Sequence, residues 1–218
     1  FLLSVVAFAC LLPLPGAAQE IALASEAAVL MDAESGQILY GKNMDSTMYP
    51  ASITKVLTGL LALKYAKETD KVTMTQAGVS QVPRTSSHIA LEPGETFTMK
   101  DALYALALVS ANDAAVAIAE TVSGSVEDFA KLMNEEAEKL GAYNSHFVNP
   151  NGMPNQEHYT TARDMALITA EALKQEGFLT YFGAKSYEMP ATNLSAVRPL
   201  VSKNQFIDGT FDCPGLLM

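Results

Sequence analysis

The sequence predicts an α+β fold, in which strands near the two ends of the chain flank a helical middle. Residues 27–41 have the pattern of a strand, a turn and a second strand, and strand-like patterns return after Gly177. Between them, apolar residues recur at helical spacing over several segments. We therefore expect an antiparallel sheet assembled from distant segments, together with a helical subdomain.

The first half of the chain begins with a predicted hairpin. Strands are expected over 27–32 and 37–41, and the Ala-Glu-Ser-Gly sequence at 33–36 is typical of the turn between them. Residues 52–66 predict a buried helix, because apolar residues occupy nearly all of its sides. Residues 72–99 mix Thr, Val, Gly and Pro, a composition that predicts short strands and loops.

Further helices are predicted in the second half. Residues 100–109 and 112–122 form two apolar helical pieces with a polar interruption between them. Residues 125–140 carry apolar side chains at helical spacing, and Ser125 is the expected N-cap. A last helix is expected over 161–174, capped by one of the threonines at its start.

Composition limits the class of function. The chain has 218 residues, of which 49% are hydrophobic, enough for one domain with a substantial core. It carries 24 acidic and 14 basic residues, a formal net charge of −10, and no basic stripe, so a nucleic-acid partner is not expected. The three histidines are scattered without metal-ligand spacing, so neither a metal nor another cofactor is expected.

The first 18 residues have the character of a secretory signal peptide. An apolar run gives way to prolines and a Gly-Ala-Ala sequence, with cleavage expected after Ala18. The positively charged start is absent, so residues 1–18 are expected to be a partial signal peptide. The run is short for a membrane span and contains two prolines. We therefore expect an exported protein, periplasmic or extracytoplasmic and associated with the cell envelope.

The most informative motif is Ser52-Ile53-Thr54-Lys55, at the start of the predicted buried helix. Helical spacing places Ser52 and Lys55 on one face, within reach of each other. A serine hydroxyl becomes a good nucleophile when a neighbouring base removes its proton. A lysine can be that base when burial keeps its amine neutral. The motif therefore predicts acyl transfer, although Ser-x-x-Lys alone also occurs at helix caps and on surfaces.

A second motif, Ser110-Ala111-Asn112, interrupts the apolar helical stretch between 103 and 119. A polar Ser-x-Asn between two apolar helices suggests a short buried connection that faces a cleft. A simple N-cap of the second helix is the alternative. Because the motif follows Ser-x-x-Lys in the order typical of penicillin-recognising serine enzymes, we favour a functional role.

With these motifs, the chain resembles the serine-type D-alanyl-D-alanine carboxypeptidases, the low-molecular-mass penicillin-binding proteins. The resemblance runs from about Ala27 to about Asn204. It includes the hairpin, both motifs with their flanking residues, and a loop followed by a helix between 147 and 164. The family implies a penicillin-binding-protein/β-lactamase-like transpeptidase fold.

The resemblance also implies a chemistry. Ser52 would attack the carbonyl of the terminal D-Ala-D-Ala bond of a peptidoglycan stem peptide, and Lys55 would take its proton. Ser110 would relay a proton to the leaving D-alanine, and Asn112 would orient Lys55 and bind the substrate amide. Water would then hydrolyse the acyl-enzyme. The expected partners are the stem peptide and β-lactam antibiotics, which would acylate Ser52.

The family's third motif, Lys-Thr-Gly or Lys-Ser-Gly, does not follow Asn112. Residues 200–206 resemble the segment that precedes it, and the triplet would fall within 209–218. We therefore expect residues 19–218 to be a C-terminally truncated catalytic domain. The family's C-terminal accessory region, through which a membrane association would be made, would be missing as well.

Three other interpretations stay open from the sequence. A serine β-lactamase shares both motifs, but a class A enzyme also uses a glutamate to activate the deacylating water. Residues 141–156, where that glutamate is expected, contain no Glu or Asp. An esterase of the same fold is a weaker option. The alternative from another class is a non-catalytic cell-wall-binding homologue.

Overall fold

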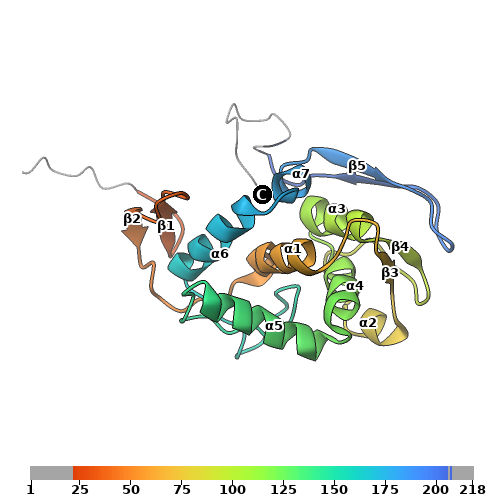
Figure 1. Ribbon diagram of the computed structural model, residues 1–218, viewed down its shortest axis with the longest axis horizontal. Helices are drawn as coiled ribbons and strands as arrows, with labels where there is room; N and C mark the ends of the chain where they lie inside the picture. The colour runs from red at the N-terminus through yellow and green to blue at the C-terminus, as the bar shows by residue number, and fades with distance from the viewer. Residues whose placement is uncertain (1–21, 206, 208–218) are drawn as a thin grey trace, which may run out of the picture.

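The computed structural model describes residues 22–205 and residue 207 (Figure 1). Helix α1 (Thr54–Tyr65) lies at the centre, and every residue from 54 to 62 is buried. It contacts α3, α4, α5, α6 and α7, which is why its sequence is apolar on nearly all sides. The predicted buried helix over 52–66 is confirmed, with its first residues forming a short 3₁₀ turn, η1 (Ala51–Ile53).

Three helices that follow one another in the chain, α3, α4 and α5, pack against α1. Side-chain caps mark the starts of α3 and α5. Helix α3 (Met99–Val109) begins with a capping box in which Thr98 and Asp101 satisfy each other's backbone N–H groups. Helix α4 (Asn112–Ser123) is rich in fully buried alanine, which allows close approach to its neighbours. Helix α5 (Val126–Lys139) starts at Ser125, the predicted N-cap, whose hydroxyl accepts a hydrogen bond from the Asp128 N–H.

Helix α6 (Ala162–Lys174) is also capped as predicted, by Thr161. Two short helices were not predicted: α2 (Gln76–Ser80) and α7 (Phe178–Phe182). Each has five residues, too few to show a helical period in the sequence. The Phe182 ring of α7 packs directly over Gly59 of α1, where a Cβ would come within 2.6 Å of the ring.

The strands form antiparallel pairs, and in the part of the chain that the structure describes there are three such pairs. They join β1 (Ala28–Met31) to β2 (Ile38–Lys42), β3 (Lys71–Thr73) to β4 (Thr96–Thr98), and β5 (Ser186–Met189) to β6 (Arg198–Val201). The α+β class and the first hairpin are confirmed. Among the described residues, the antiparallel strands form three separate two-stranded ladders rather than one sheet of distant segments.

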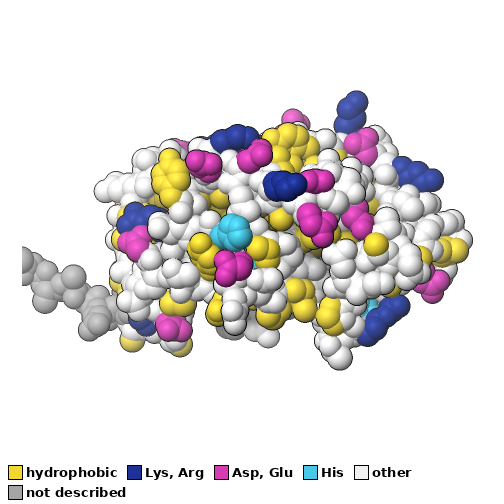
Figure 2. Space-filling model, turned by 90° about the horizontal axis from the view of Figure 1, so that it is seen from below, with side chains coloured by type: hydrophobic (Ala, Val, Ile, Leu, Met, Phe, Trp, Pro, Cys, Tyr) yellow, Lys and Arg dark blue, Asp and Glu magenta, His cyan; other side chains and the backbone are white. Residues whose placement is uncertain are grey.

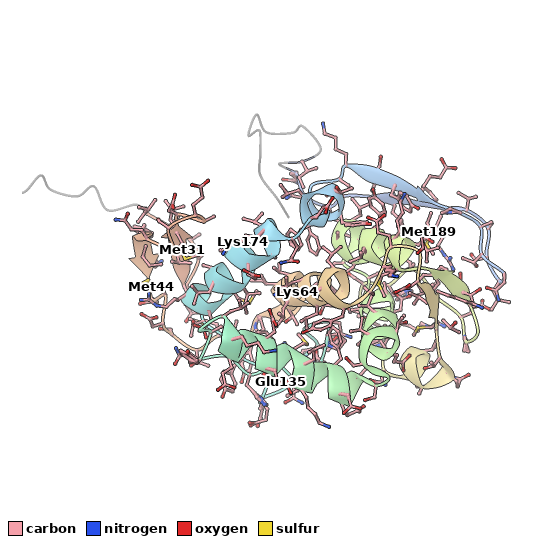
Figure 3. All side chains as sticks on the ribbon, viewed as in Figure 1. Met31, Met44, Lys64, Glu135, Lys174 and Met189 are labelled. Atoms are coloured by element: carbon pink, nitrogen blue, oxygen red, sulfur yellow. The ribbon has the colours of Figure 1, made fainter. Side chains whose placement is uncertain are left out.

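A partly exposed cluster of charges joins the central helix to two of its neighbours. Lys64 lies on α1 between α5 and α6 (Figure 3). Its ammonium contacts Glu136 at 2.5 Å and Glu171 at 3.2 Å. Burial opposes the charge of Lys64, but the hydrogen bonds and charges of the two carboxylates outweigh it and raise its pKa.

The remaining surface carries charges of both signs without a single dominant patch on the face that Figure 2 shows. None of the helices between residues 22 and 205 combines the length and the apolar character needed to cross a bilayer. The predicted signal segment, residues 1–18, and the segment 209–218 lie outside the described residues.

Candidate active site

The candidate nucleophile, Ser52, lies in η1, the turn that leads into α1. Ala51, directly before it, adopts a left-handed backbone conformation with φ of 48°, which is uncommon for a residue other than glycine. Ser52 itself is exposed, whereas Thr54 and Lys55 are fully buried. The turn therefore presents the hydroxyl at the surface, one helical turn from a buried amine.

Lys55 is held by three oxygen atoms. Its Nζ donates hydrogen bonds to Asn112 Oδ1 and to the Asn151 carbonyl, each at 2.7 Å, and to Ser52 Oγ at 3.3 Å. Burial, and to a lesser extent the positive charge of Lys203, lower the pKa of Lys55 to about 8. A substantial fraction of the amine is therefore neutral near pH 8, as a general base requires.

The second motif forms the junction between α3 and α4. Ser110 caps the end of α3 in a left-handed conformation with φ of 58°, and Asn112 begins α4. Asn112 bonds to Lys55 through its side chain, while its backbone N–H donates to the Ser87 carbonyl at 2.8 Å. Ser110 Oγ is buried and has no hydrogen-bond partner among the described residues. Three of the four predicted site residues are thus linked, and Ser110 lies beside them with its hydroxyl unpaired.

The loop 149–153 closes the other side of Lys55. Asn149 Oδ1 accepts hydrogen bonds from the backbone N–H groups of Gly152 and Met153, at 2.7 and 3.1 Å. This folds the loop back on itself and points the Asn151 carbonyl at Lys55. The sequence indicated a tight loop here but not this contact, because a backbone carbonyl leaves no mark in the residue pattern.

His158 is a buried residue that connects the start of α1 to the loop before residue 149. It is 1% exposed; its Nδ1 accepts a hydrogen bond from the Val148 N–H at 3.1 Å, so Nε2 carries the proton and donates to Thr54 Oγ1 at 2.8 Å. Burial is the main reason that the pKa of His158 falls to about 4, with the nearby His146 acting in the same direction. Neutral His158 therefore ties the loop 147–149 to the first turn of α1.

Lys203 is a second lysine near the site that the sequence did not single out. Its Nζ donates to Ser87 Oγ at 3.3 Å, and its backbone N–H donates to the Leu108 carbonyl at 3.3 Å. No short motif marks this residue, and its only signal was its place in the segment 200–206. No group of three or more His, Cys, Asp or Glu side chains in the described ranges could hold a metal ion.

Comparison with known proteins gives the chain its family. The family model described as D-alanyl-D-alanine carboxypeptidase matches residues 15–210. The D-alanyl-D-alanine carboxypeptidase DacF of Bacillus subtilis is 41% identical over 169 residues, 75% of this chain and 43% of that protein. DacA of Escherichia coli is 37% identical over 163 residues, 71% of this chain and 40% of that protein. The chain thus spans about two fifths of the length of these relatives.

Solved structures agree with this assignment. Penicillin binding protein 5 from Haemophilus influenzae superposes with a TM-score of 0.76 at 30% identity, covering 87% of this chain and 55% of that one. A D-alanyl-D-alanine carboxypeptidase from Mycobacterium tuberculosis gives 0.80 at 27% identity, covering 88% and 72%. These likenesses confirm the predicted penicillin-binding-protein-like fold. On the match of the family model and of these relatives, the chain belongs to the D-alanyl-D-alanine carboxypeptidase family.

Proposed function

We propose that this chain is the catalytic part of a serine D-alanyl-D-alanine carboxypeptidase, with Ser52 as nucleophile and Lys55 as its base. The observation that carries the proposal is the position of Lys55 Nζ. It is buried, has a lowered pKa, and lies 3.3 Å from the exposed Ser52 Oγ. A buried amine within hydrogen-bond distance of an exposed hydroxyl is the geometry that nucleophilic serine chemistry requires.

The proposed reaction has two steps. Neutral Lys55 takes the proton of Ser52 Oγ as the oxygen attacks the carbonyl carbon of the D-Ala-D-Ala bond. The C–N bond then breaks, the proton passes through the buried Ser110 hydroxyl to the leaving amine, and free D-alanine departs. Water hydrolyses the ester on Ser52 and regenerates the hydroxyl. Asn112 keeps Lys55 in place through its Oδ1. Its Nδ2, which donates a hydrogen bond to Met153 Sδ at 3.6 Å, would also bind the substrate amide.

The substrate and location follow from the same proposal. The substrate is a peptidoglycan stem peptide that ends in D-Ala-D-Ala, and the enzyme acts outside the cytoplasmic membrane, at the cell envelope. β-Lactams should acylate Ser52, because their strained amide resembles the dipeptide. In this proposal, residues 19–218 belong to the catalytic domain and contain both motifs, Ser52-x-x-Lys55 and Ser110-x-Asn112.

Intact-mass analysis after incubation with benzylpenicillin tests the proposal. We expect a mass increase equal to one penicillin, located on the Ser52 peptide and absent from the Ser52→Ala variant. Ser80→Ala is the matched control, since Ser80 is an exposed serine on α2 whose hydroxyl donates a hydrogen bond to the Gln76 carbonyl. Full labelling of the Ser52→Ala chain would refute the assignment of the nucleophile.

Two further outcomes identify the alternatives. Penicillin that is consumed without a lasting adduct would indicate a β-lactamase. Penicillin that stays intact, with no adduct, would indicate a non-catalytic homologue. Release of D-alanine from a diacetyl-Lys-D-Ala-D-Ala peptide then distinguishes carboxypeptidase activity from mere penicillin binding.

A further inference from the structure

A cavity of about 730 Å³ lies between residues 85–90 and strand β6, close to the candidate active site but not part of the hydrogen-bonded group around Lys55. Its basic lining residues are His88, Arg198 and Lys203, and the described residues that line it include no Asp or Glu. This is unexpected for a chain with 24 acidic and 14 basic residues. A cavity with positive and no negative walls favours an anionic ligand.

Lys203 supplies the uncompensated charge of this cavity. The guanidinium of Arg198 is neutralised by Glu95, which accepts two hydrogen bonds from it at 2.6 and 3.0 Å. His88 Nδ1 accepts a hydrogen bond from the Ala90 N–H, as a neutral imidazole does. Lys203 is exposed, contacts only a hydroxyl through its Nζ, and forms no ion pair within the part of the chain that the structure describes.

The cavity is joined to the active site by short contacts. Ser87 lines the cavity, and its carbonyl accepts a hydrogen bond from the N–H of Asn112, which in turn holds Lys55. The positive charge of Lys203 also lowers the pKa of Lys55. A group bound at Lys203 therefore lies close enough to belong to a molecule that reacts at Ser52.

The wall formed by residues 87–91 is preformed. The carboxylate of Asp113, on the first turn of α4, accepts hydrogen bonds from the backbone N–H groups of Ile89 and Leu91 at 3.0 to 3.2 Å. Ala90 lies between them with φ of 57°, a strained conformation that persists only when its surroundings fix it. A rigid wall lowers the entropic cost of binding a ligand.

The size and lining of the cavity indicate what it holds. It is larger than a single carboxylate needs, and it is lined by Val109, Val197 and Leu200 as well as by hydroxyl groups and Lys203. Apolar walls accommodate an aliphatic stem, and the lysine binds a carboxylate at its end. We propose that this cavity is a subsite for a carboxylate-bearing aliphatic side chain of the substrate peptide, in the residues ahead of the scissile bond, and that Lys203 binds that carboxylate. The proposal rests on the proposed function and deepens it.

Matched peptides test the subsite without turnover. Acetyl-L-Glu-D-Ala-D-Ala and acetyl-L-Gln-D-Ala-D-Ala differ by one charge and are titrated into the Ser52→Ala chain, with backbone amide NMR signals as the readout. At low ionic strength the Glu peptide should bind about fivefold more tightly. Salt should reduce this preference. Lys203→Gln should abolish it and Lys203→Glu should invert it.

Lys100→Gln is the matched control, because Lys100 is an exposed lysine at the opposite end of α3 from Val109. It should retain the preference. Equal affinities in the Ser52→Ala chain, no binding of either peptide, or a preference that survives Lys203→Gln would each overturn the subsite. The C-terminal amides of both peptides lack the C-terminal carboxylate. If Lys203→Gln weakens binding of the free acids but not of these amides, Lys203 binds the C-terminal carboxylate, and the proposed subsite is overturned.

The failure of the subsite can be told apart from the failure of the proposed function. Penicillin acylation of Ser52 with equal binding of the two peptides would overturn the subsite alone. A charge preference that depends on Lys203, in a chain that penicillin does not acylate, would support the anion site and overturn the proposed reaction.

Discussion

Gly152 lies directly against the carbonyl of Ala51, the residue before the candidate nucleophile. A Cβ built on Gly152 would come 1.7 Å from Ala51 O and 3.0 Å from Thr54 Oγ1. Gly152 also has a φ of 80°, which favours glycine in its own right. The loop 149–153 and the turn that carries Ser52 therefore fit together only because position 152 has no side chain.

This contact predicts that Gly152→Ala displaces the Ser52 turn from the loop that holds Lys55. We expect the rate of penicillin acylation to fall at least tenfold, because a small misplacement of reacting groups has large effects on rate. The melting temperature should fall as well. The rate is measured by intact mass over time, and the melting temperature by circular dichroism.

Gly94→Ala is the control for the backbone contribution. Gly94 has a φ of 82°, nearly that of Gly152, but nothing lies within 4 Å of its Cβ position. Gly94→Ala should therefore lose only the stability that a left-handed backbone costs a residue with a side chain, about 1–2 kcal/mol in the free energy of unfolding. It should be acylated at the normal rate. If the two variants acylate equally fast, the close contact with Ala51 does not position the nucleophile.

The pKa of Lys55 predicts the pH dependence of acylation. If neutral Lys55 removes the Ser52 proton, the acylation rate rises with pH and reaches half its plateau near pH 8, where burial and the charge of Lys203 together place the pKa. The measurement is the rate of benzylpenicillin adduct formation between pH 6 and 10, corrected for hydrolysis of the drug. A rate that falls over this range would contradict a neutral lysine base.

Lys203→Gln should move the same profile to higher pH. The positive charge of Lys203 disfavours the ammonium form of Lys55 and lowers its pKa, so removing that charge raises the pKa. Lys100→Gln, which removes an exposed charge at the far end of α3, should leave the midpoint in place. An unchanged midpoint in Lys203→Gln would show that the two lysines do not interact.

The longer helices and the local part of the site could be predicted from the sequence. Helices such as α1 and α5 repeat an apolar pattern over twelve residues or more, and Ser125 marks the start of α5 with a side chain that caps it. Ser52 and Lys55 are three residues apart in the chain, so their contact follows from helix geometry alone.

The rest depended on tertiary contacts that leave little trace in the sequence. Asn112 reaches Lys55 across 57 positions, and a motif indicated it, but the Asn151 carbonyl has no side-chain signature at all. The division of the later strands into separate two-stranded ladders could not be predicted, for a similar reason. A strand pattern shows that a segment is extended, but it does not show which segment becomes its partner.

The ion pair between Arg198 and Glu95 predicts a large loss of stability when it is broken from one side. Glu95 is fully buried, and although burial raises its pKa, hydrogen bonds from Arg198 and Thr192 outweigh this and lower it. Arg198→Met should therefore leave a buried carboxylate unpaired and cost about 3–5 kcal/mol at pH 7. Urea unfolding measures this cost.

The double variant Glu95→Gln with Arg198→Met is the control for the ion pair. It removes both charges together, so it should recover most of the stability that Arg198→Met loses. If the double variant is as unstable as Arg198→Met, the loss comes from packing of the arginine stem rather than from the stranded charge.

His158 predicts a loss of stability in mild acid. Its pKa is about 4 in the folded chain and 6.5 when exposed, so below pH 6.5 the unfolded state binds more protons than the folded state. Its contribution is therefore complete above pH 6.5 and is lost as the pH falls towards 4, a change of about 3 kcal/mol in the free energy of unfolding.

Urea unfolding at half-unit intervals of pH measures this change. The free energy of unfolding should depend less steeply on pH in His158→Gln, whose side chain does not titrate. If His158→Gln follows the wild-type slope instead, other groups cause the acid sensitivity, and the tie between the loop 147–149 and Thr54 does not depend on a neutral imidazole.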